Sequence, residues 1–286
     1  MLGARPADRS TLDRVIAALL SALLLLGGGG GAVADRPVAF AGGGGEVTLA
    51  GTIAVPPGPG PHPAAVLVGG FGPANRDGAF GERGDGAYRN WARELAARGL
   101  AVLRYDKRGT GESGGAALSW LDARPLAADA AAAARALARL PGVDPARVTL
   151  IGHSQGGDLA LAAAAVAPVA RIVTIGAPGR PLGLLSRASG SAGRFLRRLL
   201  GTEVAAATLR RNPLRDAARA RQPALLVHGT EDHTVPVEDM AALARARARA
   251  GRATQTLRVP GGSHFVSVDG RVPDGAFDAI ARFARA

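Results

Sequence analysis

Short apolar segments alternate with longer segments of helical periodicity along most of this chain. The shortest apolar segments contain no polar residue, which is typical of strands buried on both faces of a parallel sheet. The predicted strands span residues 64–68, 100–105, 147–152, 170–175, 224–227 and 254–259. The predicted helices span residues 91–97, 122–140, 157–166, about 237–250, and 274–285. Strands separated by helices in this order predict an α/β fold, a mostly parallel sheet with helices on both faces.

Two stretches depart from this alternation. Residues 46–55 alternate polar and apolar positions before a proline-rich break at 56–59, which predicts an early edge hairpin. Residues 177–222 contain no readable strand, and we expect them to form a helical cap inserted over the sheet. Within this insertion, apolar side chains at helical spacing favour a helix at residues 195–200.

The first 34 residues have the pattern of a targeting segment. Three arginines precede an apolar run at residues 15–26, glycines follow, and the segment ends in Ala32-Val33-Ala34. This pattern predicts a secretory signal peptide cleaved after Ala34, an exported (secreted or periplasmic) protein, and one folded domain at residues 35–286. If the glycines are counted with the apolar run, its length approaches the roughly 20 residues of a bilayer span, so an uncleaved membrane anchor stays open.

The composition narrows the class of protein. The chain has 286 residues, of which 47% are hydrophobic and 20% charged, so it is too apolar for a disordered polymer. It contains no cysteine, which excludes a disulfide scaffold, a thiolate metal site and a cysteine nucleophile. A net charge of +12 raises nucleic acid as a partner, but aromatic residues make up only 4% and no recognition motif is present. We therefore expect no nucleic-acid partner.

The positive charge is concentrated in the predicted cap and is carried by arginine. Of the 35 basic residues in the chain, only Lys107 is a lysine. Residues 177–222 contain ten arginines against Glu203 and Asp216, a net charge of +8. A basic amphipathic cap suggests contact with an anionic membrane surface or acidic substrates, whereas the simpler alternative is a solvated lid. On the helix at 237–250, Arg245, Arg247 and Arg249 are expected to form a solvated face.

One pentapeptide between a predicted strand and a predicted helix carries the strongest chemical signal. Its sequence is Gly152-His153-Ser154-Gln155-Gly156. A serine on a sharp strand-to-helix turn needs small residues two positions to either side, because the turn brings the backbone close to itself. Such a turn raises the hydroxyl above the carboxyl ends of the strands, where ligands bind in α/β sheets. We predict that Ser154 is a nucleophile; the alternative is an ordinary glycine-rich turn.

A serine nucleophile needs an imidazole to accept its proton, and the chain offers five histidines. His264 lies in a glycine-containing loop after the last predicted strand, from which it could reach the sheet edge, and we predict that it is the base. Asp232 follows the strand that ends near His228 and is predicted to orient the imidazole, with Glu231 as its rival. We expect no bound metal, because the sequence contains no metal-binding motif.

With its nucleophile turn and the order serine, acid, histidine, the chain resembles the α/β-hydrolases over nearly all of residues 35–286. Residues 105–113 resemble the turn that these hydrolases carry after the strand before the nucleophile, which implies that Asp106 is a structural turn residue. Gly69-Gly70-Phe71-Gly72-Pro73 resembles the oxyanion loop of exported bacterial esterases related to dienelactone hydrolases and prolyl-oligopeptidase-like proteins. Those proteins usually have His-Gly where this chain has Gly69-Gly70.

The resemblance extends to the oxyanion hole, which needs two preorganised backbone donors. The N–H of Gln155, directly after the serine, is one candidate. The resemblance implies that the N–H of Phe71 is the other, and an ordinary glycine turn at residues 69–72 is the alternative.

The resulting functional hypothesis is a serine hydrolase that cleaves small-molecule carboxylic esters through an acyl-enzyme and uses no cofactor. A serine peptidase or amidase and an acyltransferase share the same triad and stay open. A non-catalytic binding module is disfavoured by the intact triad. A dehalogenase is disfavoured because it would need an aspartate nucleophile at the turn.

Overall fold

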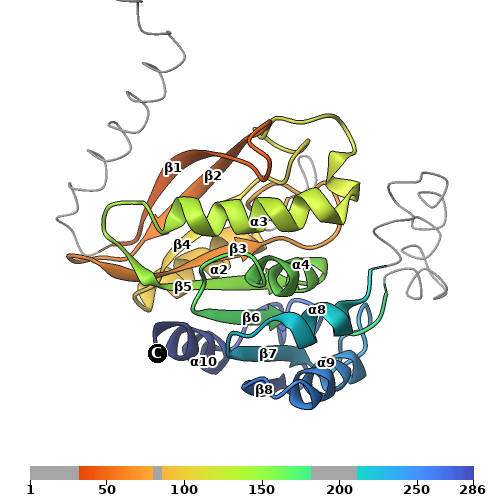
Figure 1. The fold of residues 1–286 in the computed structure, drawn as a ribbon. Coiled ribbons are helices and arrows are strands. Elements are labelled where there is room, and N and C mark those ends of the chain that lie inside the picture. The colour runs from red at the N-terminus through yellow and green to blue at the C-terminus, as the bar shows by residue number, and fades with distance from the viewer. Residues whose placement is uncertain (1–31, 80–85, 182–210) are drawn as a thin grey trace, which may run out of the picture.

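The computed structural model describes residues 32–79, 86–181 and 211–286. Within these ranges, eight strands form one sheet in the order β1-β2-β4-β3-β5-β6-β7-β8 (Figure 1). The strands are β1 (Ala34–Ala41), β2 (Thr48–Val55), β3 (His62–Val68), β4 (Ala101–Tyr105), β5 (Val143–His153), β6 (Arg171–Ile175), β7 (Ala224–Gly229) and β8 (Thr254–Val259). β1 and β2 pair antiparallel, as do β2 and β4, whereas the other neighbouring strands run parallel.

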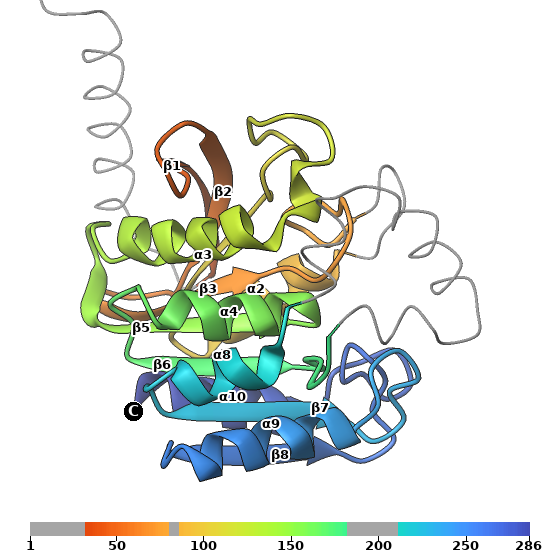
Figure 2. The same cartoon turned by 45° about the vertical axis from the view of Figure 1, so that its right-hand side comes forward.

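Helices cover both faces of this sheet, as Figure 2 shows. One face carries α2 (Ala87–Ala97) and α10 (Asp274–Arg285). The other face carries α3 (Ala123–Leu137), α4 (Gln155–Ala164), α8 (Pro213–Arg219) and α9 (Glu238–Arg249), with the short 3₁₀ helix η1 (Ser119–Leu121) before α3. This arrangement confirms the predicted mostly parallel sheet with helices on both faces.

The central strands are buried on both sides, which explains their lack of polar positions. Along β3, Ala64, Val66 and Val68 contribute to the core beneath α3 and α4. Ala65 and Leu67 contribute to the core beneath α2 and α10. Because successive side chains of a strand point to opposite faces, an unbroken apolar run fills both cores at once.

The differences from the predicted elements lie mainly at the edges. The predicted hairpin within residues 46–55 is wrong, because residues 48–55 form one strand, β2. Its partner is β1, which the sequence pattern did not predict and which pairs with β2 from Ala34 opposite Val55 to Ala41 opposite Thr48. Its residues are mostly half-buried or exposed, so its pattern lacks the apolar signature of a central strand. α2 begins at Ala87, earlier than the apolar periodicity indicates, and β5 begins at Val143.

The two ends of the predicted cap are anchored on the domain. At one end, Arg180 donates a hydrogen bond to the buried Asp239 of α9. At the other, Arg211 binds the buried Asp158 of α4 with a nitrogen–oxygen distance of 2.8 Å. α8, inside the predicted cap range, is part of the helical layer, because Ala217 is buried in the same core as α4 and α9. The apolar stripe at 195–200 lies outside the described residues.

The predicted leader lies almost wholly outside the described residues, so signal peptide and anchor both stay predictions. In the part of the chain that the structure describes, none of the helices combines the length and apolarity needed to cross a membrane.

The predicted solvated face of the 237–250 helix is wrong for Arg247, which is completely buried. Its guanidinium donates to the Thr254 hydroxyl and to four backbone carbonyl oxygens, those of Ala217, Ala220, Gln222 and Ala253. Burial, and to a lesser extent the nearby Arg252, lower the pKa of Arg247 to about 10. Arg245 and Arg249 are exposed as predicted, so the alternating arginines do not share one environment.

Candidate active site

Ser154 occupies the turn between β5 and α4 by itself. β5 ends at His153 and α4 begins at Gln155, and the serine between them has φ 54° and ψ −126°. This conformation is strained for a residue with a side chain and persists only where its surroundings impose it. One such constraint is the Ser154 N–H, which donates to the Ile175 carbonyl at the end of β6 at 2.8 Å.

The glycines two residues to either side are required by space. A Cβ on Gly152 would lie 2.1 Å from the carbonyl oxygen of Gly156. A Cβ on Gly156 would lie 2.1 Å from the carbonyl oxygen of Val68 in β3. Both distances are far below van der Waals contact with rigid backbone, so the steric reason expected from the sequence holds in the structure.

Asp232 and His264 form a pair at the carboxyl ends of β7 and β8. The Nδ1 atom of His264 lies 2.7 Å from Oδ2 of Asp232. The other carboxylate oxygen accepts the backbone N–H groups of Thr234 and Val235, each at 2.8 Å. With one oxygen held by the backbone, the carboxylate presents the other to the imidazole. Glu231, the rival acid, has an exposed side chain.

Asp232 is held in its charged form. Burial by itself would raise its pKa, but hydrogen bonds from His228 and His264 outweigh burial and hold the pKa of the carboxyl well below its usual range. His228 is itself buried, and its Nε2 lies 3.2 Å from Asp232 Oδ2 and 2.9 Å from the Val235 carbonyl oxygen. His228, in β7, therefore helps to hold the Asp232 carboxylate in its charged form.

The serine turn and the His264–Asp232 pair meet at one edge of the sheet. Gly176, which follows β6, lies beside the pair, since a Cβ there would be 3.2 Å from His264 Nδ1 and 3.3 Å from Asp232 Oδ2. His153, the neighbour of the serine, has its ring centroid 4.7 Å from that of His264. The turn that carries Ser154 therefore lies next to the His264–Asp232 pair, and the triad itself stays a prediction.

His153 is a structural histidine that sequence reasoning left without a role. Its Nε2 lies 3.1 Å from the His264 carbonyl oxygen, and its Nδ1 lies 2.9 Å from the Tyr88 hydroxyl. Because a carbonyl only accepts, Nε2 carries the proton and Nδ1 accepts from the tyrosine. Burial, and then the neighbouring His264, lower the pKa of His153 to about 3, so the ring is neutral. The tyrosine oxygen in turn accepts the Gly70 N–H at 2.9 Å.

The loop of residues 69–73, here named the glycine loop, follows β3 and passes next to Ser154. A Cβ on Gly70 would lie 3.1 Å from the Cβ of Ser154. The ammonium of Lys107 donates to the Gly70 carbonyl oxygen at 2.5 Å and to the Gly72 carbonyl oxygen. Phe71, whose N–H is the predicted oxyanion donor, lies between these two glycines and is half-buried. The other predicted donor, Gln155, is the first residue of α4.

Asp106, next to Lys107, connects the turn after β4 to the segment that follows the glycine loop. Its carboxylate pairs with the Arg76 guanidinium at 2.6 Å and accepts the Arg76 and Glu112 backbone N–H groups. These contacts agree with the structural role that the family resemblance implied for Asp106.

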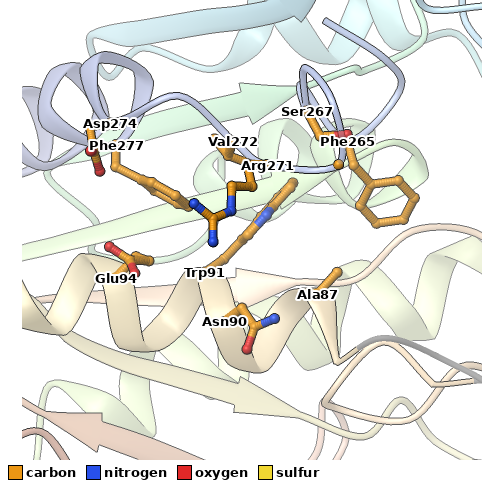
Figure 3. Close-up of a pocket in the computed structure, with 11 residues that line it drawn as sticks. Ala87, Asn90, Trp91, Glu94, Phe265, Ser267, Arg271, Val272, Asp274 and Phe277 are labelled. Atoms are coloured by element: carbon orange, nitrogen blue, oxygen red, sulfur yellow. The ribbon is translucent and has the colours of Figure 1, made fainter.

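A cavity of about 480 Å³ lies beside the loop that carries His264 (Figure 3). It is lined by Trp91, Phe265 and Phe277 together with polar side chains that include Glu94 and Arg271. Its lining does not include the three triad residues. The Phe265 ring also packs on His153, with centroids 4.3 Å apart, so the cavity borders a residue that contacts His264. Among the described residues, no cluster of three His, Asp or Glu side chains could hold a metal ion.

Comparison with known proteins identifies the family of this chain. Residues 87–285 match the prolyl oligopeptidase family. The esterase EstD of Thermotoga maritima is 34% identical over 134 residues, a segment that covers 47% of this chain but only 31% of EstD. The chain therefore spans about a third of that relative's length.

Solved structures give the fold. The α/β-hydrolase GrgF from Penicillium sp. sh18 superposes with a TM-score of 0.68 at 21% identity, covering 88% of this chain and 98% of that one. The acylaminoacyl peptidase of Pyrococcus horikoshii superposes with a TM-score of 0.67 at 19% identity, covering 88% of this chain and 41% of that one. The chain has the α/β-hydrolase fold and belongs to the prolyl oligopeptidase family of serine hydrolases.

Proposed function

We propose that this protein is a serine carboxylesterase in which Ser154 is the nucleophile, His264 the general base and Asp232 the acid that orients it. The observation that carries the proposal is the 2.7 Å contact between His264 Nδ1 and Asp232 Oδ2, at the same sheet edge as the strained Ser154. A buried carboxylate that accepts from Nδ1 leaves Nε2 unprotonated and able to take a proton.

In the acylation step, Ser154 Oγ attacks the ester carbonyl carbon while His264 Nε2 takes the hydroxyl proton. Asp232 stays ionised and stabilises the imidazolium that forms, since hydrogen bonds hold its pKa low. The backbone N–H groups of Gln155 and Phe71 bind the oxyanion of the tetrahedral intermediate. The intermediate collapses as the imidazolium gives its proton to the leaving alcohol oxygen and the carbon–oxygen bond breaks.

In the deacylation step, a water molecule replaces the alcohol. His264 takes a proton from the water, the resulting hydroxide attacks the acyl carbon, and a second tetrahedral intermediate forms in the same oxyanion hole. Its collapse returns the proton to Ser154 Oγ and releases the carboxylic acid. No cofactor enters either step.

The choice of esters over amides rests on the esterase EstD as a relative. The second candidate is a peptidase, which the family and the superposed acylaminoacyl peptidase favour. An acyltransferase would use the same residues and differ only in excluding water from deacylation. An ester has the better leaving group, so a triad of this kind is expected to cleave esters faster than matched amides.

A substrate panel tests the proposal. p-Nitrophenyl esters from acetyl to palmitoyl are compared with a peptide p-nitroanilide, using the wild type and Ser154→Ala. We expect kcat/KM to be highest for one of the esters and to be lost in the variant. Faster turnover of the anilide than of every ester would assign the protein to the peptidases. Ester turnover that survives in Ser154→Ala would contradict the proposed mechanism.

We also propose that the enzyme acts after export, because residues 1–34 have the pattern of a signal peptide. Amino-terminal sequencing of the protein from the extracytoplasmic fraction should begin at Asp35. Retention of the full amino terminus in a membrane fraction would instead identify an anchor.

A further inference from the structure

We propose that Lys107 is a positioning residue that aims the Phe71 N–H at the oxyanion of the reaction, a role that rests on the proposed function. Lys107 follows β4 and is 3% exposed. Its ammonium binds the carbonyl oxygens of Gly70 and Gly72, which flank Phe71 on either side. The side chain therefore holds the glycine loop at two points around the donor.

The geometry of the peptide bond explains how this contact acts on the donor. The carbonyl of Gly70 and the N–H of Phe71 belong to one planar trans peptide, so they point in opposite directions. With its oxygen fixed on Lys107, this peptide directs its N–H away from the ammonium. A carbonyl that accepts from a cation is also polarised, which strengthens the N–H of the same peptide as a donor.

A second contact holds Gly70 through its backbone N–H. The Gly70 N–H donates to the Tyr88 hydroxyl at 2.9 Å, and Tyr88 is anchored on the neutral His153. Both backbone polar groups of Gly70 are thus fixed by buried side chains. Because Gly70 lies against Ser154, the fixed peptide flanks the nucleophile, where an oxyanion donor is needed.

Burying the Lys107 ammonium lowers the stability of the fold. This loss of stability indicates that the position of the Gly70 and Gly72 carbonyls is important for function. Burial lowers the pKa of Lys107 to about 7, because the charged form loses its contact with water. The described partners of the ammonium are carbonyl oxygens, whereas the carboxylate of the adjacent Asp106 is taken by Arg76. A buried cation without a paired carboxylate is destabilising compared with an apolar side chain of similar length.

The choice of lysine has a physical reason. Every other basic residue of the chain is arginine, so arginine serves wherever a cation is needed. An ammonium is compact and has three donors around one atom, which suits two carbonyls only two residues apart. Because position 107 is buried, we expect a planar guanidinium there to displace the glycine loop.

Arg247 provides a matched control for a purely structural role. It is also a buried cation that holds backbone carbonyls, but it does so where β7 and β8 begin, at the end of the sheet opposite the triad. Loss of Arg247 should therefore lower stability without changing the oxyanion hole.

The test compares Lys107→Met, Lys107→Arg and Arg247→Met in the full chain. For each, kcat and KM are measured with a p-nitrophenyl ester, the inhibition constant with a trifluoromethyl ketone, and the melting temperature by circular dichroism. The trifluoromethyl ketone forms a tetrahedral oxyanion on the serine and so reports on the oxyanion hole. For both Lys107 variants we expect kcat to fall about 10- to 100-fold, less than the loss of a whole donor, with KM nearly unchanged.

The trifluoromethyl ketone should bind the Lys107 variants more weakly by a similar factor. Arg247→Met should melt at a lower temperature but keep the wild-type kcat and inhibition constant. Lys107→Arg keeps the positive charge, so it informs on positioning even if Lys107→Met does not fold. Folded Lys107 variants with wild-type kcat and inhibition constant would overturn the proposal. Losses of kcat that follow the fall in melting temperature equally in all three variants would also overturn it. Wild-type turnover that does not depend on Ser154 would contradict the proposed function instead.

Discussion

At the scale of single residues, the site depends on side chains that fix one another's protonation and direction. Asp232 accepts two backbone N–H groups on one oxygen and His264 on the other, so its carboxylate has a defined orientation. Glu231 is next in sequence but exposed. The two carboxylates therefore differ in what they can do for the base, although the sequence left them as rivals.

Asp232→Asn should reduce ester kcat roughly 10³- to 10⁴-fold, because an amide at this position no longer stabilises the imidazolium and favours the wrong tautomer of His264. Glu231→Gln serves as the matched control and should stay close to wild type. The comparison is made by steady-state kinetics with one p-nitrophenyl ester. If Glu231→Gln were the more damaging substitution, the acid would be assigned to the wrong residue.

His153 makes a prediction about acid stability. Its folded pKa of about 3 lies below the 6.5 of an exposed histidine, so between these values the unfolded chain binds a proton that the folded chain does not. Stability is therefore unaffected by this group above pH 6.5 and is lost as pH falls below it, by up to about 1.4 kcal/mol per pH unit.

His153→Gln should remove this contribution to the pH dependence, and His233→Gln, at an exposed histidine, should leave it in place. Urea unfolding of the three proteins between about pH 4 and 6 gives the free energies to compare. Equal pH slopes in the wild type and His153→Gln would show that His153 does not stay neutral in the folded state.

At the scale of elements, the parallel strands and the helices between them follow from apolar patterning, and their ends do not. β1 escaped prediction because an edge strand needs no continuous apolar face. The turn at Ser154 was predictable because only glycine fits at positions 152 and 156. The environments of Lys107, His153 and Arg247 were not predictable, because each depends on carbonyl or hydroxyl groups from segments distant in sequence.

α9 offers a test of what one buried cation contributes to its element. Arg247→Met removes this donor from four carbonyl oxygens, of which the Ala253 oxygen still accepts the Ala224 N–H. Unsatisfied buried groups cost about 1–3 kcal/mol each, so losing the donor at the other three should lower the unfolding free energy by at least ~3 kcal/mol. Arg245→Met and Arg249→Met, on exposed positions of the same helix, should each change it by less than about 0.5 kcal/mol. Urea denaturation measures all three. A similar small effect in all three variants would contradict the structural role of Arg247.

At the scale of the whole molecule, the sheet places the predicted triad residues at the carboxyl ends of its parallel strands. β5, β7 and β8 run parallel in the connected part of the sheet, so Ser154, Asp232 and His264, which follow them in the sequence, meet at their carboxyl ends. Part of the positive charge of the predicted basic cap is neutralised, because Arg180 and Arg211 form ion pairs with buried aspartates. Contact of the cap with anionic membranes stays a prediction.

The central claim is that Ser154 carries the reaction, and covalent labelling tests it most directly. The wild type and Ser154→Ala are treated with a fluorophosphonate, and the adduct is located by mass spectrometry of the digested protein. The account predicts one adduct, on Ser154 of the wild type, and no labelling of the variant, whose ester turnover falls by about 10⁴-fold or more. An adduct on another residue, or equal labelling of both proteins, would contradict the account.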